Sequence, residues 1–326
     1  MNVLPKRQRG VALLVALLVV ALAVILIAAL LDRGELALAR TRNALRSEQA
    51  QAYAQGLELF AAQILVATGN QHLDTNASPW ALPLPPQPVP GGMISATMRD
   101  LNGCFNLNNL SAHGGNPTLW APIFRNLLVA VGADPNLVEP VEGWLGNGGS
   151  AATDTNYYLG LPVAYRPRNN WFVHVSELRL VRGVTADVYA RLAPNVCALP
   201  PPTKVNVNTA TVAVLRSLGD KLSQASAEKL WNGGQANYSE PNAFAQAAMD
   251  PSVLTRLNLL GVNSAYFLAR GEITLDDIPF TFYSLIARGT GATGGVRVLE
   301  RSRGSDDALV APAPVKTALA HQKAPE

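Results

Sequence analysis

The chain has 326 residues, of which 48% are apolar and 15% are charged, and its formal net charge is +3. This length is sufficient for a membrane anchor together with one or two packed domains. The small net charge argues against a nucleic-acid-binding protein, which usually concentrates positive charge on one face.

An uninterrupted apolar run covers residues 11–31 and contains only Val, Leu, Ile and Ala. A helix of this length spans about 30 Å, the thickness of a bilayer core. Lys6, Arg7 and Arg9 precede the run, so the positive-inside rule keeps the amino terminus in the cytoplasm and exports the rest. A cleaved signal peptide fits poorly. The apolar region of a signal peptide usually spans about 7–15 residues and is followed by a cleavage region. The run in this chain is longer and passes directly into helix-compatible sequence. The sequence therefore predicts a single-pass anchor with an exported carboxy-terminal head.

The basic segment that ends at Gly10 and runs directly into the apolar residues from Val11 onward resembles a type IV prepilin leader. The resemblance implies that a prepilin peptidase cuts between Gly10 and Val11 and that Val11 is then N-methylated. Residues 1–10 are then the leader, and residues 11–31 are the transmembrane part of the amino-terminal helix. The expected location is the bacterial inner membrane, with the head in the periplasm.

The fifth position of the expected mature chain is Val15, where most pilins and pseudopilins carry Glu. In that family the Glu is thought to pair with the terminal ammonium of the subunit ahead in the filament. Its loss is a feature of protein K of the type II secretion system and fits a subunit at the filament tip. An ordinary single-span protein would also lack this Glu, so the leader alone does not distinguish a tip pseudopilin from an ordinary single-span protein.

Residues 32–68 are rich in helix formers, with apolar residues at helical spacing, and predict a continuous helix that stops at Gly69. The proline-rich residues 78–92 are expected to form an extended connector. One mostly antiparallel sheet against the helix is expected from strands at residues 93–101, 264–274, 278–287 and 296–301. Residues 304–326, rich in Ala and Pro, are expected to form a disordered tail.

The middle of the chain alternates short helical stretches with Gly, Pro and Asn turns, which predicts an α-helical domain inserted at residues 110–262. The predicted fold class is therefore α+β. A long amino-terminal helix packs on a sheet in a pilin-like domain formed by residues 32–109 and 263–303, and the inserted domain interrupts the sheet. Helices are expected at residues 120–131, 175–182, 186–192, 210–218 and 226–231.

Several short motifs, in this order, match the pattern of protein K. They are residues 100–108 with Cys-Phe-Asn-Leu-Asn, Tyr157-Tyr158, Ser176-Glu177-Leu178-Arg179 with 181–183, 205–210, and 264–268. The resemblance implies a minor pseudopilin that forms the pseudopilus tip complex with I-type and J-type minor pseudopilins and supports export of folded proteins. The major pseudopilin, the prepilin peptidase and the inner-membrane assembly platform are the other expected partners.

Cys104 and Cys197 are the two cysteines. They are too far apart for a CxxC motif and too few for a zinc site. In an exported domain they would most simply form one disulfide, and two unrelated buried thiols are the alternative. A disulfide would tie the inserted domain to the point where the chain leaves the sheet.

The stretch Val205-Asn206-Val207-Asn208-Thr209-Ala210 also resembles helix-hairpin-helix DNA-binding modules. The alternative function is therefore a minor pilin of a type IV pilus or of a DNA-uptake machine. We expect Asn208 or Thr209 to cap a helix that starts near Ala210. Phosphate binding would need a glycine hairpin, but residues 218–222 contain one glycine and Asp220, which repels phosphate. A capped packing helix is favoured, and no nucleic-acid partner is expected.

Calcium is the one cofactor that the resemblance implies, with Glu142 and Asp154 as candidate ligands. Calcium takes about six to eight oxygen ligands, and this loop is poor in acids, so a solvated glycine-rich loop is the alternative. The four histidines, His72, His113, His174 and His321, show no metal spacing and no partner Ser or Cys motif. An enzyme is therefore not expected.

Overall fold

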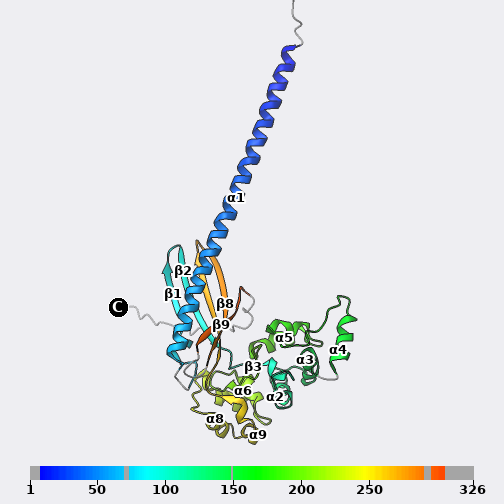
Figure 1. Cartoon of the computed structure of the whole chain (residues 1–326), viewed down its shortest axis with the longest axis vertical. Coiled ribbons are helices and arrows are strands. Elements are labelled where there is room, and N and C mark those ends of the chain that lie inside the picture. The colour runs from blue at the N-terminus through cyan, green and yellow to red at the C-terminus, as the bar shows by residue number, and fades with distance from the viewer. Residues whose placement is uncertain (1–7, 70–72, 148–149, 290–294, 305–326) are drawn as a thin grey trace, which may run out of the picture.

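The structure is a computed structural model that describes residues 8–69, 73–147, 150–289 and 295–304. Its first element is α1, Gln8–Ala67, a single helix of 60 residues. The helix contains no proline, and it ends immediately before Thr68 and Gly69, where the side chain of Thr68 donates to the carbonyl of Ile64. Figure 1 shows α1 as a rod whose first half projects away from the head. The predicted continuous helix is confirmed.

A five-stranded antiparallel sheet packs against the second half of α1. Its strand order is β1-β2-β7-β8-β9. The strands are β1 Leu84–Val89, β2 Gly92–Asp100, β7 Tyr266–Leu275, β8 Ile278–Arg288 and β9 Val296–Ser302. Asp276 and Asp277 join β7 to β8 with φ of 46° and 63°, as a tight two-residue hairpin requires. The four predicted strands are confirmed.

The edge strand β1 corrects one prediction. The proline-rich segment was expected to be a connector, but Leu84–Val89 pairs with β2. Pro85, Pro86 and Pro88 have no backbone N–H to donate, and an edge strand has a neighbour on one side only. The prolines also leave the outer edge short of donors, which discourages pairing with another sheet.

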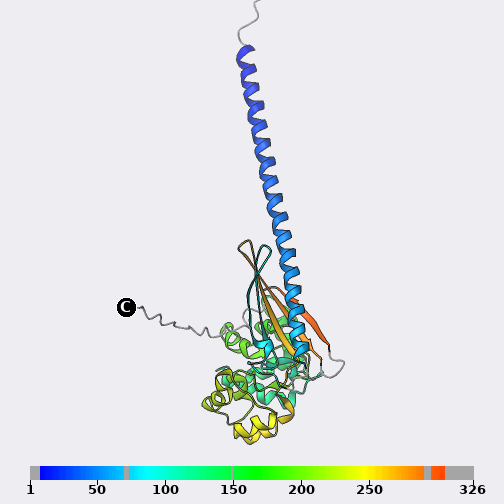
Figure 2. The same ribbon diagram turned by 90° about the vertical axis from the view of Figure 1, so that its left-hand side faces the viewer.

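Small side chains on α1 let the helix lie close to the sheet. Ala50, Ala54 and Ala61 are buried there together with Leu57 and Leu65. Across the interface lie Phe267, Ile273, Leu275 and Ile286 from β7 and β8. Figure 2 shows α1 running along one side of the head. The pilin-like half of the fold is therefore a helix laid on one face of a sheet.

The chain leaves the sheet after β2 and returns at β7, and the residues between are mainly helical. The α-helices are α2 Pro117–Ala130, α3 Val138–Trp144, α4 Ser150–Leu159, α5 Ala186–Leu192, α6 Val212–Ser217, α7 Gln224–Trp231, α8 Pro241–Ala248 and α9 Pro251–Leu254. The 3-10 helices between β2 and β7 are η2 Leu107–Leu110, η3 Pro135–Leu137, η4 Val175–Leu180, η5 Ala193–Asn195, η6 Asn232–Gly234 and η7 Leu257–Leu259. One more 3-10 helix, η1 Pro79–Ala81, lies between α1 and β1. Two short parallel pairs join β3 Phe105–Asn106 to β4 Val196–Cys197, and β5 Val205–Asn206 to β6 Leu260–Gly261.

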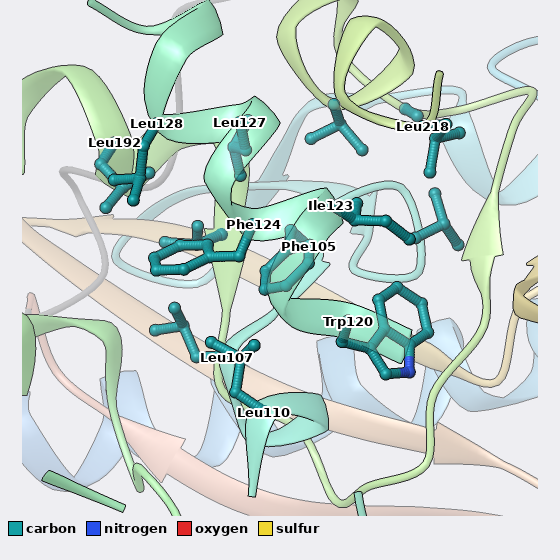
Figure 3. Close-up of a cluster of buried hydrophobic side chains, with 14 of the residues drawn as sticks. Phe105, Leu107, Leu110, Trp120, Ile123, Phe124, Leu127, Leu128, Leu192 and Leu218 are labelled. Atoms are coloured by element: carbon teal, nitrogen blue, oxygen red, sulfur yellow. The ribbon is translucent and has the colours of Figure 1, made fainter. Parts of the chain in front are cut away.

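The helical part has a core of its own (Figure 3). Phe105 stacks on Phe124 with ring centroids 5.1 Å apart and meets Trp120 edge to face at 5.7 Å. In Figure 1, α6, α8 and α9 lie at the end of the head opposite the projecting half of α1. The helical part therefore covers the pole of the molecule farthest from the anchor. The predicted boundaries at residues 109/110 and 262/263 stay predictions.

The helical stretch expected at residues 175–182 is present as the 3-10 helix η4. The predicted cap of α6 is wrong. The helix expected near Ala210 begins at Val212, and its cap is Thr211, whose hydroxyl accepts from the Val214 N–H. Asn208 and Thr209 do not cap it, because their side chains bond to distant segments.

Candidate assembly interface

The first half of α1 is an apolar rod without contacts to the head. Among the described residues, α1 is the one helix long and apolar enough to cross a membrane. Its large apolar side chains are exposed from Val11 to Leu31, and Val15 is among them. So much exposed apolar surface on a single helix needs lipid or protein around it. Gly10 and Val11 both lie within α1, and cleavage between them stays a prediction.

The head meets α1 first at Arg46. Its guanidinium pairs with Asp276, in the β7–β8 turn, at 2.8 Å. Residues 32–45 therefore separate the apolar rod from the head by about 20 Å of exposed helix. The head stands clear of the apolar segment by roughly that distance.

A second ion pair fixes α1 to the sheet edge. Glu58 is largely buried; it accepts from the Arg301 guanidinium of β9 at 2.8 Å and from the Ser284 hydroxyl of β8 at 2.5 Å. Burial alone would raise the pKa of Glu58, but the hydrogen bonds from Arg301 and Ser284 and the charge of Arg301 together lower it. Glu58 is thus held as a carboxylate against the sheet.

A buried carboxylate joins the end of α1, the sheet and the helical part. Asp74 accepts from the Trp80 indole N–H at 2.9 Å, from the Ser264 backbone N–H at 2.8 Å and from the Arg288 guanidinium. Its backbone carbonyl accepts from the Asn206 side-chain amide at 3.1 Å. Asp74 is 1% exposed, so each partner is held without competition from water.

Asp100, at the end of β2, is a second buried carboxylate at the contact between the sheet and the helical part. We call this contact, centred on Asp74 and Asp100, the joint. It accepts from the hydroxyls of Ser264 and Thr209, both at 2.5 Å, and from the Asn102 N–H at 2.6 Å. Burial raises the pKa of Asp100, although hydrogen bonds from these three residues act in the opposite direction. Asp74 and Asp100 together hold the helical part against the sheet.

The asparagines of two sequence motifs have structural roles here. Asn106 accepts from the Leu199 N–H at 3.0 Å and donates to the Leu199 carbonyl at 3.1 Å. Asn208 makes the same reciprocal pair with the backbone of Tyr238. Such amides replace backbone partners where regular secondary structure stops. The Cys-Phe-Asn-Leu-Asn and Val-Asn-Val-Asn motifs therefore hold connections within the head.

The disulfide between Cys104 and Cys197 is present, with a sequence separation of 93 residues. Cys104 directly precedes β3, and Cys197 is the last residue of β4. The two cysteines pack with Leu101, Leu268 and Tyr283 on the face of the sheet opposite α1. The predicted pairing is confirmed.

The hairpin between α6 and α7 contains one glycine and the acidic side chain of Asp220. Asp220 pairs with Arg256 at 2.7 Å and stays half exposed. The half-exposed Asp220 carboxylate, which Arg256 partly neutralises, is unfavourable for an approaching phosphate. The structure therefore adds no support for DNA binding.

Of the two expected calcium ligands, the structure describes the side chain of Glu142. Among the described residues, no group of three or more His, Cys, Asp or Glu side chains comes together. Burial raises the pKa of Glu142, while Arg125 acts against the increase. Asp154 lies in α4, and its side chain is outside the described set. His72 and His321 lie outside the described residues. Calcium binding at Glu142 and Asp154 stays a prediction.

An apolar helix that projects from a head made of a sheet and a distal helical part is the architecture of a pilin-like subunit. Residues 103–201 match the family model "Type II secretion system (T2SS), protein K". Protein K of Pseudomonas aeruginosa is 33% identical over 315 residues, which cover 91% of this chain and 93% of the relative. Protein K of Aeromonas hydrophila is also 33% identical, over 87% of this chain and 94% of the relative. The chain belongs to the type II secretion system protein K family.

A solved structure supports the same assignment. It is the GspK-GspI-GspJ complex of the type 2 secretion system of enterotoxigenic Escherichia coli. The matched chain is 27% identical, with a TM-score of 0.70, and the match covers 81% of this chain and 99% of the other.

Proposed function

We propose that this chain is a minor pseudopilin that forms the pseudopilus tip complex with I-type and J-type companions. Through that complex it would support export of folded proteins across the outer membrane. Membership of the protein K family supports the proposal, and so does the related chain solved as part of a GspK-GspI-GspJ complex. The chain's own contribution is binding and not chemistry.

The position of the helical part carries the tip assignment. It lies at the pole opposite the anchor, where the next subunit of a growing filament would otherwise stack (Figures 1 and 2). Val15 agrees with this position, because a subunit with nothing ahead of it has no ammonium to pair with a carboxylate. The proposed orientation is an inner-membrane α1 with the head in the periplasm.

Processing and assembly follow from the same proposal. Prepilin peptidase would cut between Gly10 and Val11, and Val11 would be methylated. The major pseudopilin and the inner-membrane assembly platform would then incorporate the mature chain. The alternative, a DNA-uptake pilin, has less support because Asp220 makes its hairpin unsuited to phosphate.

Co-purification tests the proposal. The tagged full-length chain is expressed in a bacterial membrane with its I-type and J-type companions and extracted in mild detergent. We expect both companions to be recovered with it, and a tagged single-span protein of unrelated fold to recover neither. Equal recovery with both baits would contradict the proposal, whereas salt-dependent DNA retention by this chain would favour the alternative.

A further inference from the structure

The excess positive charge of the chain is concentrated in one stretch of the helical part. Residues 157–182 contain four basic side chains and one acidic one, a net charge of +3. The whole chain has 26 basic and 23 acidic residues, so the rest of it has 22 of each and is neutral. The four basic residues are all arginines, and we call them the arginine cluster: Arg166, Arg168, Arg179 and Arg182. A local excess of this kind attracts partners of negative charge.

Aromatic contacts hold together the two segments that carry the arginine cluster. The Tyr165 hydroxyl donates to the Leu180 carbonyl at 2.8 Å. The Arg182 N–H donates to the hydroxyl of the buried Tyr158 at 3.0 Å. The rings of Tyr158 and Tyr165 lie 5.3 Å apart. The arginines are therefore carried on a fixed base, and less ordering is required when a partner binds.

The arginine cluster has little negative charge of its own to pair with. Arg166 and Arg168 are exposed, and among the residues that the structure describes they make no ion pair. The single carboxylate of the stretch, Glu177, is turned toward the backbone, where Oε1 accepts from the N–H groups of Val173 and His174 at 2.7 and 3.2 Å. A guanidinium pairs best with a carboxylate or phosphate, which it can bind through two parallel hydrogen bonds. The partner must therefore supply the anions.

Exposed apolar side chains lie in the same two segments as the arginines. Val163 is 81% exposed, Leu180 46% and Tyr157 42%, and the Arg182 guanidinium lies over the Tyr157 ring at 5.3 Å. Tyrosine and arginine are enriched in protein–protein interfaces, whereas lysine, absent from this stretch, is depleted. Binding to a nucleic-acid backbone depends mainly on charge and has no need of exposed aliphatic side chains. The mixture therefore fits a protein partner.

The arginine cluster lies between α4 and α5 in the sequence, and Figure 1 shows both helices on one side of the head, away from the half of α1 that packs on the sheet. We infer that the cluster is a docking surface for an acidic protein segment in which carboxylates flank apolar side chains. The carboxylates pair with the guanidinium groups, and the apolar side chains cover Val163 and Leu180. This docking surface is additional to the proposed tip function and does not depend on it.

The test measures binding of a defined acidic peptide to the full-length chain in non-ionic detergent. The probe is a short fluorescein-labelled peptide rich in Glu with interspersed Leu, and binding is followed by fluorescence anisotropy. We expect the double variant Arg166→Glu with Arg168→Glu to weaken binding at least tenfold. Arg40→Glu with Arg42→Glu is the matched control, because these two arginines of α1 are also exposed, have the same spacing and give the same change of net charge. The control should bind the peptide like wild type.

Three comparisons can overturn the inference. Equal weakening by the two double variants would show attraction to net charge and not to this surface. Equal binding of a peptide with Ser in place of Leu would remove the apolar half of the recognition. Tighter binding of a single-stranded DNA oligonucleotide or of anionic phosphatidylglycerol vesicles than of the acidic peptide would show that the partner is not a protein. Thermal unfolding, expected unchanged in both double variants, shows that a loss of binding is not misfolding.

Discussion

Removal of the Asp74 carboxylate should loosen the joint between the sheet and the helical part. Asp74→Ala leaves the Arg288 side chain, which is 6% exposed, without its counter-ion. It also leaves the indole N–H of Trp80 and the backbone N–H of Ser264 without their acceptor. Breaking a buried ion pair by deleting one partner costs about 3–5 kcal/mol.

The expected loss is large enough to measure as a shift in melting temperature. For a folded unit of about 150–250 residues, 1 kcal/mol corresponds to roughly 2–4 °C, so Asp74→Ala should lower Tm by about 6–20 °C. The assay is thermal unfolding of the full-length protein in mild detergent, followed by tryptophan fluorescence. Asp187→Ala is the control, because it removes an exposed carboxylate that pairs with Arg191. An exposed ion pair of this kind contributes about 0–1 kcal/mol to the free energy of unfolding, so Tm should change little.

A double variant separates the ion pair from simple loss of packing. Arg288→Met in the Asp74→Ala background removes the stranded charge, so the double variant should be no less stable than Asp74→Ala alone. Equal Tm values for Asp74→Ala and Asp187→Ala would refute the reasoning. The single variant Arg288→Met completes the comparison. A Tm loss in the double variant equal to the sum of the losses in the two single variants would refute the reasoning as well.

Three further predictions concern other parts of the chain. Cys104→Ser with Cys197→Ser should cost about 4–5 kcal/mol in chemical unfolding, from the 93-residue separation that the disulfide spans; a loss below about 1 kcal/mol would contradict this. The pKa of Glu58 is lower in the folded chain than in the unfolded chain, where it is near 4.5. The pairing of Glu58 with Arg301 therefore stabilises the fold fully at pH values above 4.5, and this contribution is lost as the pH falls through the folded-state pKa. Melting temperature should therefore fall more steeply with acid in wild type than in Glu58→Gln, and parallel curves would count against it. Gly10→Leu should leave the precursor uncut, so its intact mass should include the leader; a mature mass like that of wild type would argue against prepilin processing.

Local patterns were enough to predict much of the fold. The helix formers of α1 and the apolar alternation of β2, β7, β8 and β9 are properties of neighbouring residues, so the sequence predicted these elements close to their observed bounds. The proline-rich segment was misjudged because edge position, which permits Pro85 and Pro86 in a strand, depends on the rest of the sheet.

The joint could not be predicted from local patterns, because its contacts are long-range. Asp74 meets Ser264 and Arg288 across 190 and 214 residues of sequence, and Thr209 meets Asp100 across 109. Thr209 was expected to cap a nearby helix, and that role falls to Thr211 because Thr209 is already bound to Asp100. Any Thr or Asn near a helix start gives the same local pattern, so only the tertiary structure shows which one is free to cap.

The amino terminus of the mature chain tests the central claim most directly. Mass spectrometry of the full-length protein, recovered from membranes of cells that contain prepilin peptidase, would identify its first residue. We expect a chain that begins at N-methylated Val11 and keeps the apolar half of α1. A mature chain that begins beyond Leu31 and is found in the soluble fraction would contradict the assignment to a membrane-anchored pseudopilus subunit.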